Sequence, residues 1–238
     1  DISNNSDVDT VAEVQALADA VQSVMDAAAG AADKPTKAEL EALGITGVTT
    51  DNLAAIQQAI AATSDDGTGV DDLGELQTLA TNAAAAAANA LTSISAAAQA
   101  NDATSSSLAQ SVYEDAGVTG VVSASILADI NALLDTANID GAATDTTGEV
   151  QALVDGYIAI QTAADGTADN NASDPTQADY AAIGVTGVDD AEEEALLGDV
   201  IDAANGADVN TQGEVKALAD AVQSVMEAAA GAADKPTK

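Results

Sequence analysis

Apolar residues recur at helical spacing through most of the chain, and no segment alternates apolar and polar residues over the length of a strand. Behind Thr10, aliphatic and alanine side chains follow a 3.6-residue period: Val14, Leu17, Ala18, Val21 and Val24. The same stripe returns over residues 150–158 and 215–225. Because this spacing puts the apolar positions on one face of a helix, the pattern predicts an all-α fold.

Each long helix is predicted to begin at a capping residue followed three positions later by glutamate. The four pairs are Thr10 and Glu13, Asp72 and Glu75, Thr146 and Glu149, and Thr211 and Glu214. At this spacing the two side chains satisfy each other's free backbone N–H groups. The second of these helices is expected to run to Ile94 or beyond, because the segment is rich in alanine, the best helix former.

Two shorter helices are predicted after each of the first three long ones. The earlier one stops at a glycine, Gly44, Gly117 or Gly184, which suits the left-handed residue that closes a helix. A G-[IV]-T-G-V turn then leads to the later helix. Three short amphipathic helices bury their apolar stripes by packing on one another. We therefore expect tandem three-helix bundles in an extended linear array.

A long repeat sets the domain organisation. Residues 12–37 return at 213–238, 201 residues later, with three differences: Ala12/Gly213, Gln15/Lys216 and Asp26/Glu227. The pattern predicts three-helix modules at 1–71, 72–145 and 146–210, the second with a long alanine-rich first helix, and a partial module at 211–238. Such a repeat also suggests a window from a longer tandem array, in which neighbouring repeats stabilise one another.

Charge narrows the classes of partner. The chain has 40 Asp and Glu residues against 5 lysines, with no Arg or His, and its formal net charge is −35. Nucleic acid and anionic membrane surfaces would be repelled. The alanine-rich stretch 82–100 is interrupted by Asn, Thr, Ser and Gln, so no membrane insertion is expected. Self-repulsion of this size favours a salty exterior, where it is screened. No signal peptide is expected in these residues, since the start has no basic and apolar leader.

The order of short helix, G-[IV]-T turn, helix, polar link and a glutamate followed by valine or leucine resembles the GA-type three-helix module of bacterial surface proteins. The matching residues are 40–79, 113–154 and 180–218. The bias toward Ala, Asp, Thr and Val is similar to that of acidic tandem repeats in very large bacterial adhesins. The resemblance implies a helical-bundle array, an extracellular or cell-surface location and a stalk-like role.

Some modules of that family bind serum albumin through their second helix and its flanking turns. The corresponding face here, around residues 50–60, offers acidic and small side chains. Interface hot spots usually need aromatic or basic anchors. The resemblance therefore implies the architecture and location, and albumin binding is not carried over from it.

Candidate chemistry is sparse. Without His, Cys or Arg, nucleophile activation by histidine is excluded, and we expect no enzyme activity and no catalytic or cofactor-binding residue. The three tyrosines, Tyr113, Tyr157 and Tyr180, are expected to be buried in small cores with their hydroxyls at the edge.

Calcium is the cofactor that the sequence leaves open. Oxygen-bearing side chains alternate at Asp165, Thr167, Asp169 and Asn171, and calcium takes oxygen ligands. The EF-hand pattern is not met, because Asn170 replaces the glycine and Thr176 the closing glutamate. A looser set is Asp202, Asn205 and Asp208. The acidic run 189–194 is expected to form the first turn of a helix, and the alternative for it is a cation-binding or partner-facing patch.

Together these features predict a structural repeat region: a stalk, spacer or extracellular filament of a giant secreted or cell-surface protein that serves adhesion or biofilm and matrix formation. The expected partners are neighbouring repeats of the same chain, and copies of itself if a fibre forms. The alternative is a module that binds calcium or a host protein such as albumin.

Overall fold

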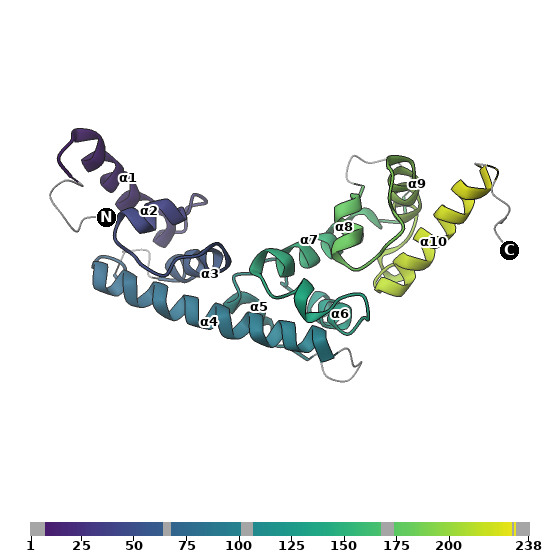
Figure 1. Ribbon diagram of the computed structural model, residues 1–238, viewed down its shortest axis with the longest axis horizontal. Helices are drawn as coiled ribbons and strands as arrows, with labels where there is room; N and C mark the ends of the chain where they lie inside the picture. The colour runs from purple at the N-terminus through teal and green to yellow at the C-terminus, as the bar shows by residue number, and fades with distance from the viewer. Residues whose placement is uncertain (1–7, 64–67, 101–106, 168–173, 230, 232–238) are drawn as a thin grey trace. The chain divides into compact units, whose positions relative to one another are not determined.

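The computed structural model describes residues 8–63, 68–100, 107–167, 174–229 and 231. In these residues the chain is all-helical, as predicted, with ten α-helices and no strand (Figure 1). An isolated antiparallel bridge joins Asp165 and Asn205. No helix in the described ranges is both long and apolar enough to cross a membrane.

Four long helices alternate with pairs of shorter ones. The long helices, which we call first helices, are α1 (Val11–Ala28), α4 (Leu73–Ala100), α7 (Thr147–Ala163) and α10 (Gln212–Ala229). The shorter ones are α2 (Lys37–Ala42), α3 (Thr50–Ala61), α5 (Gln110–Asp115), α6 (Ala124–Leu134), α8 (Gln177–Ala182) and α9 (Ala191–Asp202). Single 3-10 turns, η2 (Gly141–Ala143) and η3 (Gly206–Asp208), precede α7 and α10. The apolar pattern does not predict these turns.

The predicted capping boxes form at Thr10, Thr146 and Thr211. In each, the threonine hydroxyl accepts the N–H of the glutamate three residues on at 3.3 Å. The glutamate accepts the threonine N–H at 2.9 to 3.1 Å. The helices therefore begin where the sequence indicates. The glycine predicted to end the earlier short helix is also in place, since Gly44 follows α2 with a left-handed φ of 85°.

Asp72 caps α4 differently. Its Oδ1 accepts the N–H groups of Gly74 at 2.6 Å and Glu75 at 3.4 Å. A hydrogen bond with Asp71, followed by partial desolvation and the charges of Asp71 and Asp72, raises the pKa of Glu75. Glu13 shows the opposite effect, because hydrogen bonds from Thr10 lower its pKa. The pKa of Glu75 is thus raised mainly by Asp71, the residue before the cap, with a smaller contribution from the charge of Asp72.

The chain folds into two compact units, and the first comprises Asp1–Ser93 and Ser111–Val118. Here α1 packs against α2 and α3. The core includes Val24 of α1, Leu40 of α2 and Ile56 of α3, together with Leu76 and Ala80 of α4. The beginning of α4 therefore completes the core formed by α1, α2 and α3.

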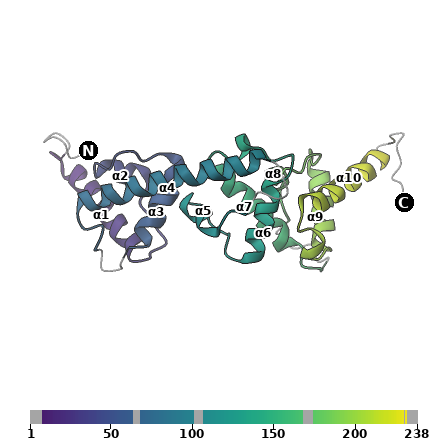
Figure 2. The same ribbon diagram turned by 90° about the horizontal axis from the view of Figure 1, so that it is seen from below.

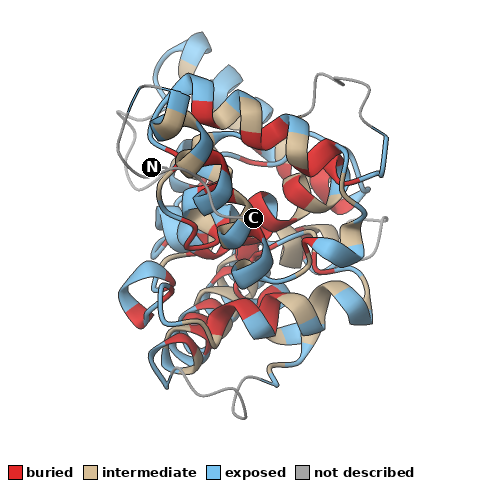
Figure 3. Ribbon diagram, turned by 90° about the vertical axis from the view of Figure 1, so that its right-hand side faces the viewer, coloured by how far each residue is buried: buried red, intermediate tan, exposed pale blue. Residues whose placement is uncertain are grey.

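The second unit comprises Ile94–Gln110 and Thr119–Lys238. In it α7 contacts α6, α8 and α9, and α9 contacts α10 (Figure 2). The buried residues of α7 cover one broad face of the helix, from Val150, Val154 and Tyr157 round to Gly156, Ile160 and Ala163. Figure 3 shows how buried residues follow stripes along the helices, with exposed residues beside them. The division into modules 1–71, 72–145 and 146–210 stays a prediction.

Candidate functional site

Two of the four predicted calcium ligands, Asp165 and Thr167, lie in the turn after α7. Asp165 accepts the N–H of Thr167 at 2.8 Å on its Oδ1, which closes a tight turn at Gly166, where φ is 82°. The other two predicted ligands, Asp169 and Asn171, lie outside the described residues. Calcium binding by this set therefore stays a prediction.

The structure brings the second oxygen-rich set beside the first. Asn205 pairs with Asp165 through the isolated bridge, and its Nδ2 donates to Asp208 Oδ2 at 3.2 Å. Asp202, at the end of α9, is buried. In the ranges that the structure describes, no group of three or more carboxylates is placed to hold a metal ion. The contacts that are present fix the two turns against each other.

The acidic run 189–194 supplies caps for helix starts. Asp190 is the N-cap of α9 and accepts the N–H of Glu193 at 2.8 Å. Glu193 accepts the N–H of Asp189 at 2.8 Å, and Glu194 accepts the N–H of Gln177, at the start of α8, at 3.2 Å. These carboxylates sit where the helix dipole favours negative charge. The expectation of an acidic first turn is confirmed.

A contact that recurs in both units ties a G-[IV]-T-G-V turn to the next first helix. In the first unit, Thr46 N–H donates to Gln77 Oε1 at 2.9 Å, and Gln77 Nε2 donates to the Thr46 carbonyl at 3.2 Å. In the second unit, Thr119 and Gln151 make the same two bonds at 2.8 and 3.2 Å. The side-chain amide thus pairs with both backbone groups of one threonine. We call this pairing the glutamine clamp.

The turn at Gly184 is held by different groups. The clamp position on α10 carries Lys216, which forms an ion pair with Asp220 on its own helix. Gln212, also on α10, donates to the Gly184 carbonyl at 2.9 Å, and Asn138 donates to the same oxygen at 3.1 Å. The turn is therefore still anchored to the following first helix, by a side chain one turn earlier.

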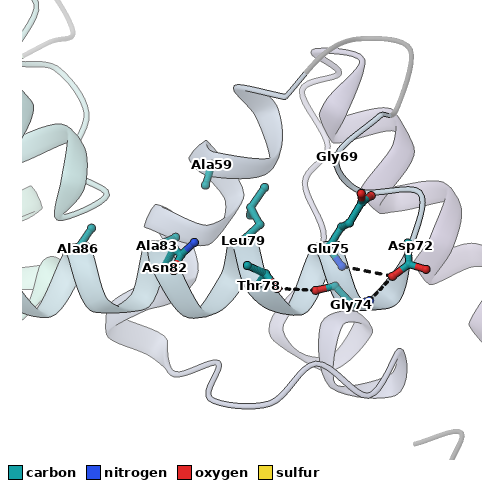
Figure 4. A pocket seen from close by; sticks show the side chains of 10 residues that line it. All are labelled: Ala59, Gly69, Asp72, Gly74, Glu75, Thr78, Leu79, Asn82, Ala83 and Ala86. Carbon is teal, nitrogen blue, oxygen red and sulfur yellow. Dashed lines mark hydrogen bonds between the residues drawn. The ribbon is translucent and has the colours of Figure 1, made fainter.

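An open groove of about 730 Å³ lies between the end of α3 and the first half of α4 (Figure 4). Its lining consists of Ala59, Gly69, Asp72, Gly74, Glu75, Thr78, Leu79, Asn82, Ala83 and Ala86. The hydroxyl of Thr78 donates to the Gly74 carbonyl at 2.7 Å, and Asp72 accepts N–H groups at the helix start. The hydroxyl of Thr78 and one oxygen of Asp72 therefore serve the local backbone, and the lining offers a ligand apolar surface beside the carboxyl group of Glu75 and the amide of Asn82.

The clamp residues are not predicted by the apolar pattern, although the sequence carries a signal for them. Glutamine stands two residues after the capping-box glutamate in three of four first helices, at Gln15, Gln77 and Gln151. A glutamine at a solvent-facing helix position looks unremarkable, and its partner lies 31 or 32 residues away. Repetition in register with the threonine turn is the feature that marks it.

Comparisons of the chain with protein-family models, with curated proteins and with solved structures give no match.

Proposed function

We propose that this chain is a structural repeat region, a stalk, spacer or extracellular filament segment of a giant secreted or cell-surface bacterial protein that serves adhesion or biofilm and matrix formation. One observation carries the proposal: first helices pack on helices that precede them in the chain as well as on helices that follow them. Leu76 and Ala80 of α4 lie in the core of α1, α2 and α3, and α7 contacts the preceding α6 as well as the following α8 and α9. Such sharing links cores in series, which suits a spacer.

The finer architecture of the proposal is a row of three-helix bundles, α1–α3, α4–α6 and α7–α9, with α10 opening a fourth. The contacts of α1 with α2 and α3, and of α7 with α8 and α9, support this grouping. The two glutamine clamps support it too, because each joins the turn of one group to the first helix of the next. The GA-type resemblance agrees with the same grouping.

The charge supports an exposed, extended role. A net charge of −35 makes neighbouring chains repel one another and keeps them soluble. In salt the repulsion is confined to short range, about 8 Å at physiological ionic strength. An acidic stalk on a cell surface would hold its neighbours apart while its terminal domains reach a target.

A calcium-binding module is the second candidate, and the bridge between Asp165 and Asn205 favours it. That bridge places two oxygen-rich turns together, and extracellular calcium sites bind with dissociation constants of about 10⁻⁴ to 10⁻³ M. Bound calcium would stiffen the link between α7 and α9 without changing the spacer role of the remaining helices.

Small-angle scattering separates the two candidates. We would measure the chain in about 0.5 M NaCl, where charge repulsion is largely screened, with and without millimolar calcium, and with magnesium as the ionic-strength control. A passive spacer keeps the same radius of gyration in all three buffers. A change with calcium alone, absent from the Asp165→Asn variant, would favour the calcium-binding module.

A further inference from the structure

α1 and α10 have nearly the same sequence, yet they bury different sides of it. The first side, which we call the upstream face, consists of Val14, Ala18 and Val21 in α1 and Val215, Ala219 and Val222 in α10. In α10 this face is buried, with Val215 only 1% exposed. In α1 it is exposed: 53% of Val14 and 49% of Val21 is accessible.

The opposite holds for the other side of the two helices. Val24 of α1 is 2% exposed and packs in the core with residues of α2 and α3. Its counterpart in α10, Val225, is 47% exposed. Since the side chains are the same, neighbouring elements decide which face is buried. α1 packs against helices that come after it in the chain, α2 and α3, whereas α10 packs against a helix that comes before it, α9.

The inner first helices show what covers an upstream face. In α4 the face includes Leu76 and Ala80, which lie in the core of the preceding helices α1, α2 and α3. In α7 the Tyr157 hydroxyl donates to Asp129 of α6, the preceding helix, at 2.5 Å. In α10 the buried face belongs to a helix that contacts α9. In all three, the upstream face meets a preceding helical group.

The clamp position of α1 matches those of the inner first helices. Gln15 corresponds to Gln77 and Gln151, and its Nε2 donates to Asp19 at 2.7 Å. Gln151 makes the same contact with Asp155, at 2.8 Å, while its Oε1 accepts from Thr119. Gln15 therefore makes the same contact along its own helix that Gln151 makes while it is bound to the Thr119 turn.

We propose that the upstream face of α1, with Gln15 beside it, is a docking surface for a preceding repeat of the same polypeptide, whose turn and last helix have the sequence of residues 184–202. This occupant follows from α10, which contacts α9 of that segment and buries the same three side chains, Val, Ala and Val. The threonine equivalent to Thr186 closes a glutamine clamp with Gln15. This inference rests on the proposed function, since it requires a tandem array.

A two-copy chain tests the docking surface. Residues 1–210 are followed directly by residues 10–238, so that the α1 sequence of the second copy takes the place of α10 and keeps the repeat register. Val14→Asp is introduced in the single chain and, separately, at the equivalent position of the second copy. We expect hydrogen exchange in this helix to be about tenfold slower in the two-copy chain than in the single chain. We expect Val14→Asp to remove that protection.

Three single-chain variants calibrate the measurement. Val14→Asp and the exposed-site control Val122→Asp should each change the melting temperature by less than about 1 °C, since both valines are exposed. Val215→Asp, at the same helix position in α10, should lower it by about 5 °C or more, because Val215 is buried. The contrast between Val215→Asp and Val14→Asp shows that the melting temperature detects a charge placed in an upstream face that is already covered.

Three results would overturn the docking proposal. One is an effect of Val14→Asp that is as large in the single chain as in the two-copy chain. Another is no effect in either chain. The third is a wild-type single chain that dimerises in sedimentation and loses this dimer on Val14→Asp, because the occupant would then be a second molecule. Scattering by the same two-copy chain tests the spacer proposal separately: an extended chain without the exchange effect contradicts docking alone.

Discussion

Tyr157 and Tyr180 are both buried, but their hydroxyls lie in different environments. Tyr157 donates to Asp129 at 2.5 Å, and burial, this bond and the aspartate charge raise the pKa of Tyr157. The Tyr180 ring is fully buried in α8, and its hydroxyl is the one buried side-chain polar atom without a hydrogen-bond partner in the described ranges. The expectation that each hydroxyl lies at the edge of its core is wrong for Tyr180.

Phenylalanine substitutions at the two sites should therefore have different effects. Tyr157→Phe removes a bond to a charged group, and we expect it to lower the free energy of unfolding by about 1–2 kcal/mol. Tyr180→Phe removes a desolvated hydroxyl with no partner, and we expect no loss, or a gain of up to about 1 kcal/mol. Urea unfolding of both variants measures the difference. Equal losses at the two sites would show that the Tyr180 hydroxyl is hydrogen-bonded.

Glu149 and Glu75 should give pH dependences of opposite sign. Hydrogen bonds from Thr146 lower the pKa of Glu149, whereas the bond with Asp71 and nearby negative charge raise that of Glu75. Glu149→Gln should therefore destabilise the fold at pH 7, and this deficit should vanish as the pH falls through the folded pKa, below 4.5.

Glu75→Gln should instead stabilise the fold at pH 7. That gain is complete above the raised pKa and disappears as the pH falls to the ordinary value of 4.5. Melting temperatures of wild type and both variants from pH 3 to pH 7 provide the comparison. The same sign for both variants at pH 7 would contradict the opposite effects of Thr146 on Glu149 and of Asp71 on Glu75.

At the scale of elements, the glutamine clamp makes a prediction that compares two equivalent positions. Gln151→Lys removes the acceptor for Thr119 N–H and replaces the paired amide by an ammonium group that can only donate, and we expect a loss of about 1–3 kcal/mol in unfolding free energy. Gln15→Lys, on the exposed side of α1, should change it by less than about 0.5 kcal/mol. Lysine occurs naturally at this position in α10, so the helix itself tolerates it. Chemical denaturation of both variants measures the two losses, and a comparable loss at Gln15 would mean that the clamp bonds contribute little.

The shared-helix arrangement predicts a second contrast between equivalent positions. Val24→Ala empties part of a packed core and should cost about 2 kcal/mol. Val225→Ala, on the exposed side of α10, should cost less than about 0.5 kcal/mol. The measurement is guanidinium unfolding of each variant beside wild type. Similar costs would indicate that α10 packs on both faces in the single chain.

Helix positions follow from the sequence because their determinants are local. Thr36 and Glu39 fix the start of α2, and alanine carries α4 to Ala100, as expected. The choice of buried face is not local. From Val14 and Val215 onward α1 and α10 have the same apolar residues, and the neighbouring elements decide whether the face that begins at these valines is buried. The clamps escape prediction for the same reason, since Thr46 and Gln77 are each ordinary surface residues until the fold brings them together.

At the scale of the whole molecule, electrostatic repulsion dominates. The ion pairs present in the described residues, Lys37 with Glu41 and Lys216 with Asp220, each lie within one helix at its surface. Such pairs contribute about 0.3–0.5 kcal/mol, which is small beside the repulsion expected at a net charge of −35. The fold is therefore built from caps and small apolar cores, with solvent ions screening its surface.

Salt should stabilise the fold. Raising NaCl from about 0.05 M to about 1 M shortens the Debye length to about 3 Å, and we expect the melting temperature to rise by several degrees. Potassium chloride serves as a control for specific sodium binding. A melting temperature that stays constant or falls over this range would show that repulsion between carboxylates does not limit stability.

Scattering by the two-copy chain, compared with the single chain in about 0.5 M NaCl, tests the central claim most directly. The two-copy chain is about 1.8 times as long. A compact protein of that length has a radius of gyration only about 1.3 times larger. A serial array of docked modules grows nearly in proportion to its length, so the spacer proposal predicts a ratio close to 1.8. A ratio near 1.3 would contradict it, because the added repeat would then have folded back onto the first.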